Sequence, residues 1–174
     1  MTKVIVYFHG YNSGPESEKV FKLMKAFPDD AIYSFPINID PEIAQKDLEN
    51  NIDDLLIDHL NEDIKLIFVG TSLGGWWVSR LAKLYNCPGI IINPCYSPQK
   101  SLEKYGVSED ILKKYSSMKF YSDKDYYFIA LHDEVIEPIV DYSWKNLKVY
   151  ENESVKHRFN GPEFNDVIEL IKKL

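Results

Sequence analysis

A serine stands between two glycines at residues 70–74, Gly-Thr-Ser-Leu-Gly, a pattern typical of a nucleophile on a sharp strand-to-helix turn. Residues 64–69 before it are continuously apolar and residues 76–85 after it are compatible with a helix, which is the setting that such a turn requires. A glycine-rich turn that only caps a helix is the alternative, and the context favours the nucleophile. We therefore predict that Ser72 is a nucleophile and that the Leu73 N–H, at a helix start, stabilises an oxyanion.

A serine hydroxyl needs a base to accept its proton, and the chain has four histidines. With this kind of turn the expected chain order is serine, acid, histidine, which favours His157 in the polar loop after the last apolar run. His132 also follows a strand. His59 lies on the apolar side of an expected helix, where structural packing is the simpler interpretation, and His9 fits the bracing of a loop. For His157 the alternative is an ordinary charged surface loop.

The base needs a carboxylate to hold its ring, and acidic residues follow the apolar run at residues 126–131. We predict Asp133 as this acid because of its position at the strand end. Glu134 and Glu137 are close enough to compete, and any of the three could be a solvated loop charge.

The second oxyanion donor usually lies in the loop after an early strand, and residues 9–14 form such a loop here. We assign it to the Tyr11 N–H, although Tyr11 could also be an ordinary packed aromatic residue. Trp76 and Tyr96 are candidates for an acyl pocket, with core or lid packing as an equally strong alternative.

Short apolar runs alternate with amphipathic stretches along the chain. The apolar runs lie at residues 4–8, 31–35, 64–69, 89–92, 126–131 and 147–150, and the helical stretches at about 15–27, 40–59, 76–85 and 162–174. This alternation predicts a single α/β domain over residues 1–174, with a mostly parallel sheet of about six strands, helices on both faces and a small lid-like insertion at residues 95–122. Together with the turn at Ser72 and the order serine, acid, histidine, it predicts a compact α/β-hydrolase.

Composition narrows the classes of partner. The formal net charge of -7 opposes binding to nucleic acid or to an anionic membrane surface, and no apolar run is long enough to insert into a bilayer. Cys87 and Cys95 are the only cysteines, and no export signal is recognisable, so we expect a reduced, cytoplasmic setting. We expect no metal and no cofactor. His132, Asp133 and Glu134 are adjacent, and neighbouring side chains rarely all point to one ion.

These residues together resemble a known family, the YqiA/YcfP-like esterases of the α/β-hydrolase superfamily. The resemblance spans nearly the whole chain and rests on five motifs, at residues 7–17, 70–75, 93–94, 133–135 and 157–159. It implies hydrolysis of a carboxylic ester or an acyl-CoA thioester, with Ser72, Asp133 and His157 at the catalytic positions and a small-molecule acyl ester or thioester as substrate.

The chain departs from the family pattern at two places. His132 stands where the family usually has a glycine before the acid, and Val155 and Lys156 replace glycines before the histidine. These changes concern the geometry of the loops. Two other classes of function remain open: a non-catalytic binding protein that retains the hydrolase fold, and a Cys95 nucleophile, which lacks the strand-to-helix turn and is more simply a buried, inert thiol.

Overall fold

The computed structural model describes residues 1–119 and 123–174. Its described part contains a six-stranded sheet in the order β2-β1-β3-β4-β5-β6, and every neighbouring pair of strands is parallel. The strands are β1 Thr2–Phe8, β2 Ala31–Ser34, β3 Ile64–Thr71, β4 Gly89–Ile92, β5 Tyr126–Ala130 and β6 Leu147–Tyr150. The predicted parallel sheet of about six strands is confirmed. Because the strands are parallel, all their carboxyl ends meet at one edge of the sheet.

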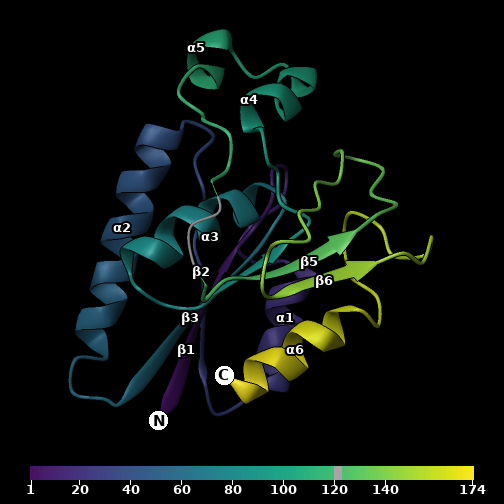
Figure 1. Ribbon diagram of the computed structural model, residues 1–174. Helices are drawn as coiled ribbons and strands as arrows, with labels where there is room; N and C mark the ends of the chain where they lie inside the picture. Colours follow the sequence, from purple (N-terminus) through teal and green to yellow (C-terminus); the bar gives the residue numbers. More distant parts are fainter. Residues whose placement is uncertain (120–122) are drawn as a thin grey trace.

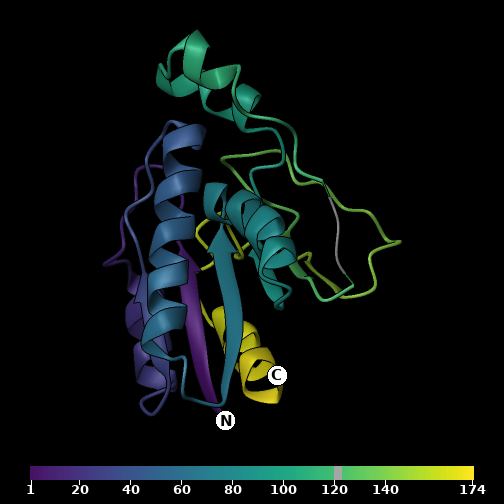
Figure 2. The same ribbon diagram turned by 90° about the vertical axis from the view of Figure 1, so that its left-hand side faces the viewer.

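Helices cover both faces of this sheet, as Figures 1 and 2 show. The four longer helices are α1 Glu18–Ala26, α2 Pro41–Asp58, α3 Leu73–Leu84 and α6 Phe164–Lys173. One apolar cluster packs α2 and α3 against the sheet, and a second cluster packs α1 and α6 against the opposite face. Strand β1 alternates between the two clusters, with Val4 and Val6 in the first and Ile5 and Tyr7 in the second.

The helix boundaries follow the capping chemistry. Asp40 caps α2, since its side chain accepts a hydrogen bond from Glu42 N at 3.0 Å, as the Asp-Pro pair predicts. Helix α1 begins later than the expected residue 15, because Ser17 O is the first carbonyl that accepts helical bonds, from Val20 N and Phe21 N. Helix α3 starts at once after Ser72, three residues earlier than expected.

The segment between β4 and β5 rises above the carboxyl edge of the sheet (Figure 1). It contains α4 Pro98–Ser101, the short 3-10 helix η1 Glu103–Tyr105 and α5 Glu109–Leu112. Tyr115 Oη donates to Ile39 O at 2.7 Å and Lys114 pairs with Asp40 at 2.6 Å, so the segment is tied to the start of α2. Residues 120–122 of the expected lid lie outside the described residues. We call residues 95–119 the cap segment.

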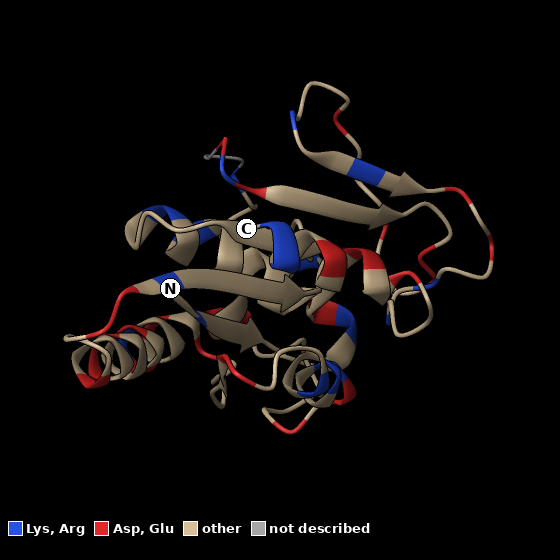
Figure 3. Ribbon diagram, turned by 90° about the horizontal axis from the view of Figure 1, so that it is seen from below, with Lys and Arg blue, Asp and Glu red and all other residues tan. Residues whose placement is uncertain are grey.

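Charged residues lie on the helices and loops, while the strands are almost free of them (Figure 3). This distribution is typical of a sheet that is buried on both faces. Among the described residues, no helix combines the length and the apolar character needed to cross a bilayer.

Candidate active site

Ser72 occupies a strained turn between β3 and α3. Its φ of 58° and ψ of -121° are unusual for a residue with a side chain. Backbone bonds hold the turn in place, because Ser72 N donates to Ile92 O at 3.0 Å and Ser72 O accepts from Gly75 N and Cys95 N, each at 2.9 Å. The serine is thus fixed between β4 and the first turn of α3.

The two flanking glycines are required by close backbone contacts. A Cβ atom on Gly74 would stand 1.9 Å from the carbonyl oxygen of Phe8 in β1, and one on Gly70 would stand 2.3 Å from the Gly74 carbonyl oxygen. Only glycine avoids these overlaps. The small residues of the sequence pattern therefore allow α3 to start directly against the ends of β1 and β3.

Asp133 and His157 form a hydrogen-bonded pair in the loops after β5 and β6. His157 Nδ1 lies 2.6 Å from Asp133 Oδ2, and the two side chains are only 12% and 1% exposed. Because a carboxylate can only accept, Nδ1 carries the proton and Nε2 has its lone pair free. The other carboxylate oxygen, Oδ1, accepts from Val135 N at 2.8 Å and Ile136 N at 2.9 Å. The carboxylate is thus oriented by three donors.

The two competing acids lie elsewhere. Glu134 Oε2 accepts a hydrogen bond from the backbone N of His157 at 3.1 Å and so contacts the histidine through its main chain. Glu137 is exposed. The ring partner of His157 in this structure is Asp133.

Asn93 is a buried residue of this site to which sequence analysis gave no role. Its amide nitrogen donates to His157 O at 3.1 Å and Lys156 O at 3.3 Å, and its Oδ1 accepts from Ala130 N at 2.7 Å. The side chain therefore joins the end of β4 to the end of β5 and to the histidine loop. Its signal in the sequence was a polar residue directly after a fully apolar strand.

The other three histidines have local roles. His59 Nε2 lies 3.0 Å from Tyr33 Oη and its Nδ1 lies 3.0 Å from Glu62 Oε2. His132 is exposed and its ring contacts Glu151 O. His9 is buried with its Nδ1 against Gly10 O, and burial lowers the pKa of its ring.

Four of the predicted site residues line one cavity of about 510 Å³ at the carboxyl edge of the sheet: Tyr11, Ser72, Leu73 and His157. The loop that carries Tyr11 runs against the serine, since a Cβ on Gly10 would lie 3.3 Å from Ser72 Cβ. Leu73 is the first residue of α3, so its N–H has no carbonyl partner within the helix. Among the described residues, no hydrogen bond joins Ser72 Oγ to the His157 ring.

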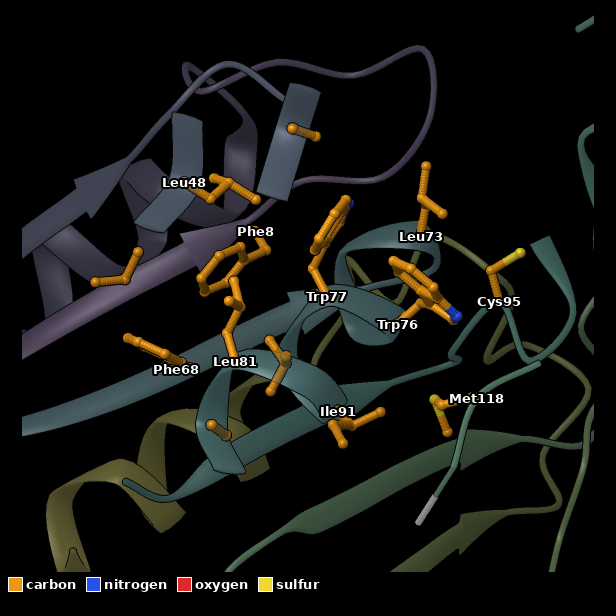
Figure 4. Packing of buried hydrophobic residues seen from close by; sticks show 14 of the residues in the cluster. Phe8, Leu48, Phe68, Leu73, Trp76, Trp77, Leu81, Ile91, Cys95 and Met118 are labelled. Atoms are coloured by element: carbon orange, nitrogen blue, oxygen red, sulfur yellow. The ribbon is translucent and has the colours of Figure 1, made fainter. Parts of the chain in front are cut away.

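Trp76 and Tyr96, the candidates for an acyl pocket, are not among the residues that line this cavity as far as the structure describes it. Trp76 is 2% exposed, its Nε1 donates to Ser116 O at 2.8 Å, and its ring packs edge-on against Trp77 and Tyr115. Figure 4 shows Trp76 and Trp77 inside the cluster between Leu73 and Ile91. Helix α3 thus turns these indoles into the core beneath the cap segment.

The two cysteines are buried and unpaired. Cys95 borders the cavity, and burial raises the pKa of its thiol to about 11. A protonated thiol is a poor nucleophile, which argues against the Cys95 alternative. Within residues 1–119 and 123–174, no group of three or more His, Cys, Asp or Glu residues is placed to hold a metal ion.

The fold and the strand–Ser72–helix turn define the class: the protein has the α/β-hydrolase fold. Solved structures support this over nearly the whole chain. An esterase from Pyrococcus furiosus aligns with a TM-score of 0.69 and 15% identity over 98% of this chain and 81% of its own. Mouse alpha/beta hydrolase domain-containing protein 10 aligns with a TM-score of 0.68 and 17% identity over 97% of this chain and 88% of its own. Est1E from Butyrivibrio proteoclasticus, with bound ferulic acid, aligns with a TM-score of 0.66 and 12% identity over 99% of this chain and 87% of its own.

The family follows from the sequence comparison. The profile of the uncharacterised protein family UPF0227 matches residues 4–133, so the chain belongs to this family. Curated relatives include UPF0227 protein YcfP of Escherichia coli, 31% identical over 102 residues, and a UPF0227 protein of Enterobacter sp. strain 638, 30% identical over 102 residues; each alignment covers 58% of this chain. The chain spans 55% of the length of these relatives. The resemblance to a YcfP-like family is confirmed.

Proposed function

We propose that the protein is a serine hydrolase that cleaves a carboxylic ester or a thioester through an acyl-enzyme on Ser72. The observation that carries this proposal is the buried Asp133–His157 pair, whose histidine lines the same cavity as the strained Ser72. The names of the solved relatives, an esterase among them, agree with the proposal.

In the first step, His157 Nε2 accepts the Ser72 hydroxyl proton as Oγ bonds to the substrate carbonyl carbon. The carbonyl π electrons move to oxygen, and the Leu73 and Tyr11 N–H groups donate to the resulting oxyanion. Asp133 stays ionised and holds the imidazolium. The Ser72–His157 bond forms when substrate displaces water from the cavity, since catalytic hydrogen bonds often tighten only in the complex.

In the second step, the oxyanion collapses and the bond to the leaving group breaks. The leaving oxygen or sulfur takes the proton from His157, which leaves the acyl group on Ser72. Water then attacks this acyl-enzyme, again with His157 as base, and releases the acid and the free serine. His157 thus carries every proton that these steps move.

Labelling with a fluorophosphonate probe, read by intact-protein mass, tests the proposal. We expect one label on the wild type, no label on Ser72→Ala, and labelling slowed by at least about a hundredfold in His157→Ala and Asp133→Asn. Ser13→Ala is the matched control, because Ser13 lines the same cavity but its hydroxyl takes no part in the proposed reaction.

Assays of short and long acyl esters and thioesters run beside the labelling. A folded wild type that takes no label and hydrolyses none of them would overturn the hydrolase proposal in favour of a binding protein on the same fold. Labelling retained in Ser72→Ala would move the nucleophile to another residue.

A further inference from the structure

The cavity beside Ser72 has two chemically different walls. The apolar wall comes from the cap segment and the loop after β5. A hydrogen bond from Lys104 Nζ to Val135 O joins these two segments. Its residues are Cys95, Leu102, Tyr105, Val135 and Ile136. The polar wall comes from the start of α1 and the loop after His157, and includes Ser17, Lys19, Arg158 and Asn160. A ligand that fills both walls must be apolar at one end and polar at the other.

Lys19 is the unusual residue of the polar wall, because it is only 7% exposed and has no ion-pair partner among the described residues. Its ammonium donates to two neutral oxygens, Arg158 O and, at 2.7 Å, Asn160 Oδ1. An ammonium has three donors, so one is left unbonded, although Nζ also lies 6.0 Å from the centroid of the Phe164 ring. Burial lowers the pKa of Lys19 to about 8, which leaves it mostly charged at neutral pH. A buried cation without a counter-ion costs free energy that a bound anion would recover.

A second positive charge lies beside it. Arg158 lines the cavity and its guanidinium makes no ion pair among the residues that the structure describes, yet its charge is close enough to act on Lys19. Two acids, Glu18 and Glu163, act on the charge of Lys19. Both have other partners: Glu18 pairs with Lys22 at 2.9 Å and accepts from Asn160 at 2.8 Å, and Glu163 accepts from Gly161 N at 2.7 Å. The polar wall is therefore cationic in a protein whose net charge is -7.

The position of His157 decides which end of a substrate faces the polar wall. In the proposed reaction His157 returns its proton to the leaving group, so the leaving group lies on the histidine side of the ester. Arg158 is the next residue along the chain, and Lys19 is bonded to its carbonyl. The acyl group then faces the apolar wall.

We propose that Lys19 and Arg158 bind an anionic group, a carboxylate or a phosphate, on the leaving alcohol of the substrate. This inference rests on the proposed hydrolase function for the orientation of the ester, but the anion site itself can be tested without catalysis. Charge-assisted hydrogen bonds to a carboxylate or phosphate are among the stronger contacts that a protein makes.

Three acetate esters with matched phenol leaving groups provide the kinetic test: para-acetoxybenzamide, para-acetoxybenzoate and para-acetoxyphenyl phosphate. We expect Lys19→Met and Arg158→Met each to lower kcat/KM for an anionic ester by about tenfold more than for the amide. The benzoate and the phosphate arms show which anion is preferred. Lys25→Met is the matched control on the exposed side of the same helix, and it should change none of the three values.

A purely structural role of Lys19, as a tether between α1 and the histidine loop, predicts a different result. All three esters would then slow by the same factor in Lys19→Met, and that outcome overturns the inference. Comparing ratios of variant to wild type for each ester removes the intrinsic reactivity of the phenols.

Binding to the inactive Ser72→Ala protein separates this inference from the proposed function. Titration followed by protein NMR should show tighter binding of the anionic esters than of the amide, by about tenfold, and Lys19→Met added to Ser72→Ala should abolish the difference. Equal binding of all three esters refutes the anion site. If the anionic esters bind more tightly but the wild type hydrolyses none of the three esters, the anion site is kept and the hydrolase proposal is refuted.

Discussion

Strand β5 carries a buried carboxylate at each end, and the two ends differ in what surrounds the charge. Asp133, after the strand, accepts three hydrogen bonds, from Val135 N, Ile136 N and His157 Nδ1. Asp125, before the strand, is 2% exposed, and no partner among the described residues meets hydrogen-bond geometry with either oxygen. Burial alone therefore does not distinguish the proposed triad acid Asp133 from Asp125. The donors around Asp133 do, and they are found at the carboxyl edge of the sheet.

Side-chain bridges between loops occur at both edges of the sheet. At the carboxyl edge, polar side chains bridge separate loops, as Asn93 does between β4, β5 and the histidine loop. These contacts give each loop a defined position without regular structure. At the opposite edge Asn146 Nδ2 likewise donates to Asp123 O at 3.1 Å and Asp125 O at 3.2 Å, but among the described residues no hydrogen bond reaches the Asp125 carboxylate. Substitutions at the two ends of β5 should thus change different properties, activity at one end and pH-dependent stability at the other.

The largest effect is expected for Asp133→Asn. The amide cannot hold His157 with a proton on Nδ1, so the base would present the wrong tautomer to Ser72. We expect kcat for ester hydrolysis to fall by about 10⁴-fold with folding retained. Steady-state kinetics beside a thermal melt would check this. A fall of less than tenfold would mean that Asp133 does not orient the base.

Asp125→Asn should act on stability and its pH dependence. Burial raises the pKa of Asp125 to about 7, and the nearby Gly89 N–H offsets only part of this effect. A carboxyl whose folded pKa is raised gives stability that is complete below its unfolded pKa, near 3.9, and is lost as pH rises through about 7. Asp125 should thus make the wild type about 3 kcal/mol less stable at pH 8 than at pH 5.

Urea unfolding at pH 5 and pH 8 measures this difference. Asp125→Asn should lack the loss of stability that ionisation of Asp125 causes. Its free energy of unfolding, relative to that of the wild type, should therefore be higher at pH 8 than at pH 5. Asp123→Asn is the control, because the Asp123 side chain is 80% exposed and paired with Lys145. Parallel pH curves for wild type and Asp125→Asn would show that Asp125 is ionised in the folded protein at both values.

Asn93→Gly tests the bridge at the carboxyl edge. Glycine tolerates the φ of 40° found at this position, so the change removes only the side chain. We expect a loss of about 2 kcal/mol in the free energy of unfolding, because Ala130 N and the carbonyls of Lys156 and His157 lose a buried partner. The kcat should fall as well, with KM less affected, since the loop that positions His157 loosens. Unchanged kcat would limit Asn93 to a role in stability.

Sequence patterns predicted well the features that depend on residues close together in the chain. The strands, the turn at Ser72 and the Asp40 cap each follow from a few consecutive residues, and the structure has them within a few positions. Trp76 shows the limit. Its position on α3 was read correctly, but whether an aromatic side chain faces a cavity or the core depends on the cap segment, whose contacts come from distant residues such as Ser116.

The choice of acid was open for the same reason. Asp133, Glu134 and Glu137 are nearly adjacent, so sequence position cannot separate them, and the contact with His157 spans 24 residues. The hydrogen bond from Asn93 Nδ2 to His157 O joins residues still farther apart, 64 positions along the chain. In the sequence, the only sign of such a long-range hydrogen bond is a polar residue at the end of a strand.

Glu134→Ala should have the smallest effect of the four and would complete the comparison of acids. Glu134 accepts from the His157 backbone N–H at 3.1 Å in an exposed position, where water can replace the lost partner. We therefore expect a fall in kcat/KM of no more than about tenfold and a stability loss of about 1 kcal/mol. Glu137→Ala, at an exposed side chain nearby, is the matched control and should behave as the wild type. A loss in Glu134→Ala as large as that in Asp133→Asn would mean that the loop's backbone position, and not only the ring's orientation, decides whether His157 can act on Ser72.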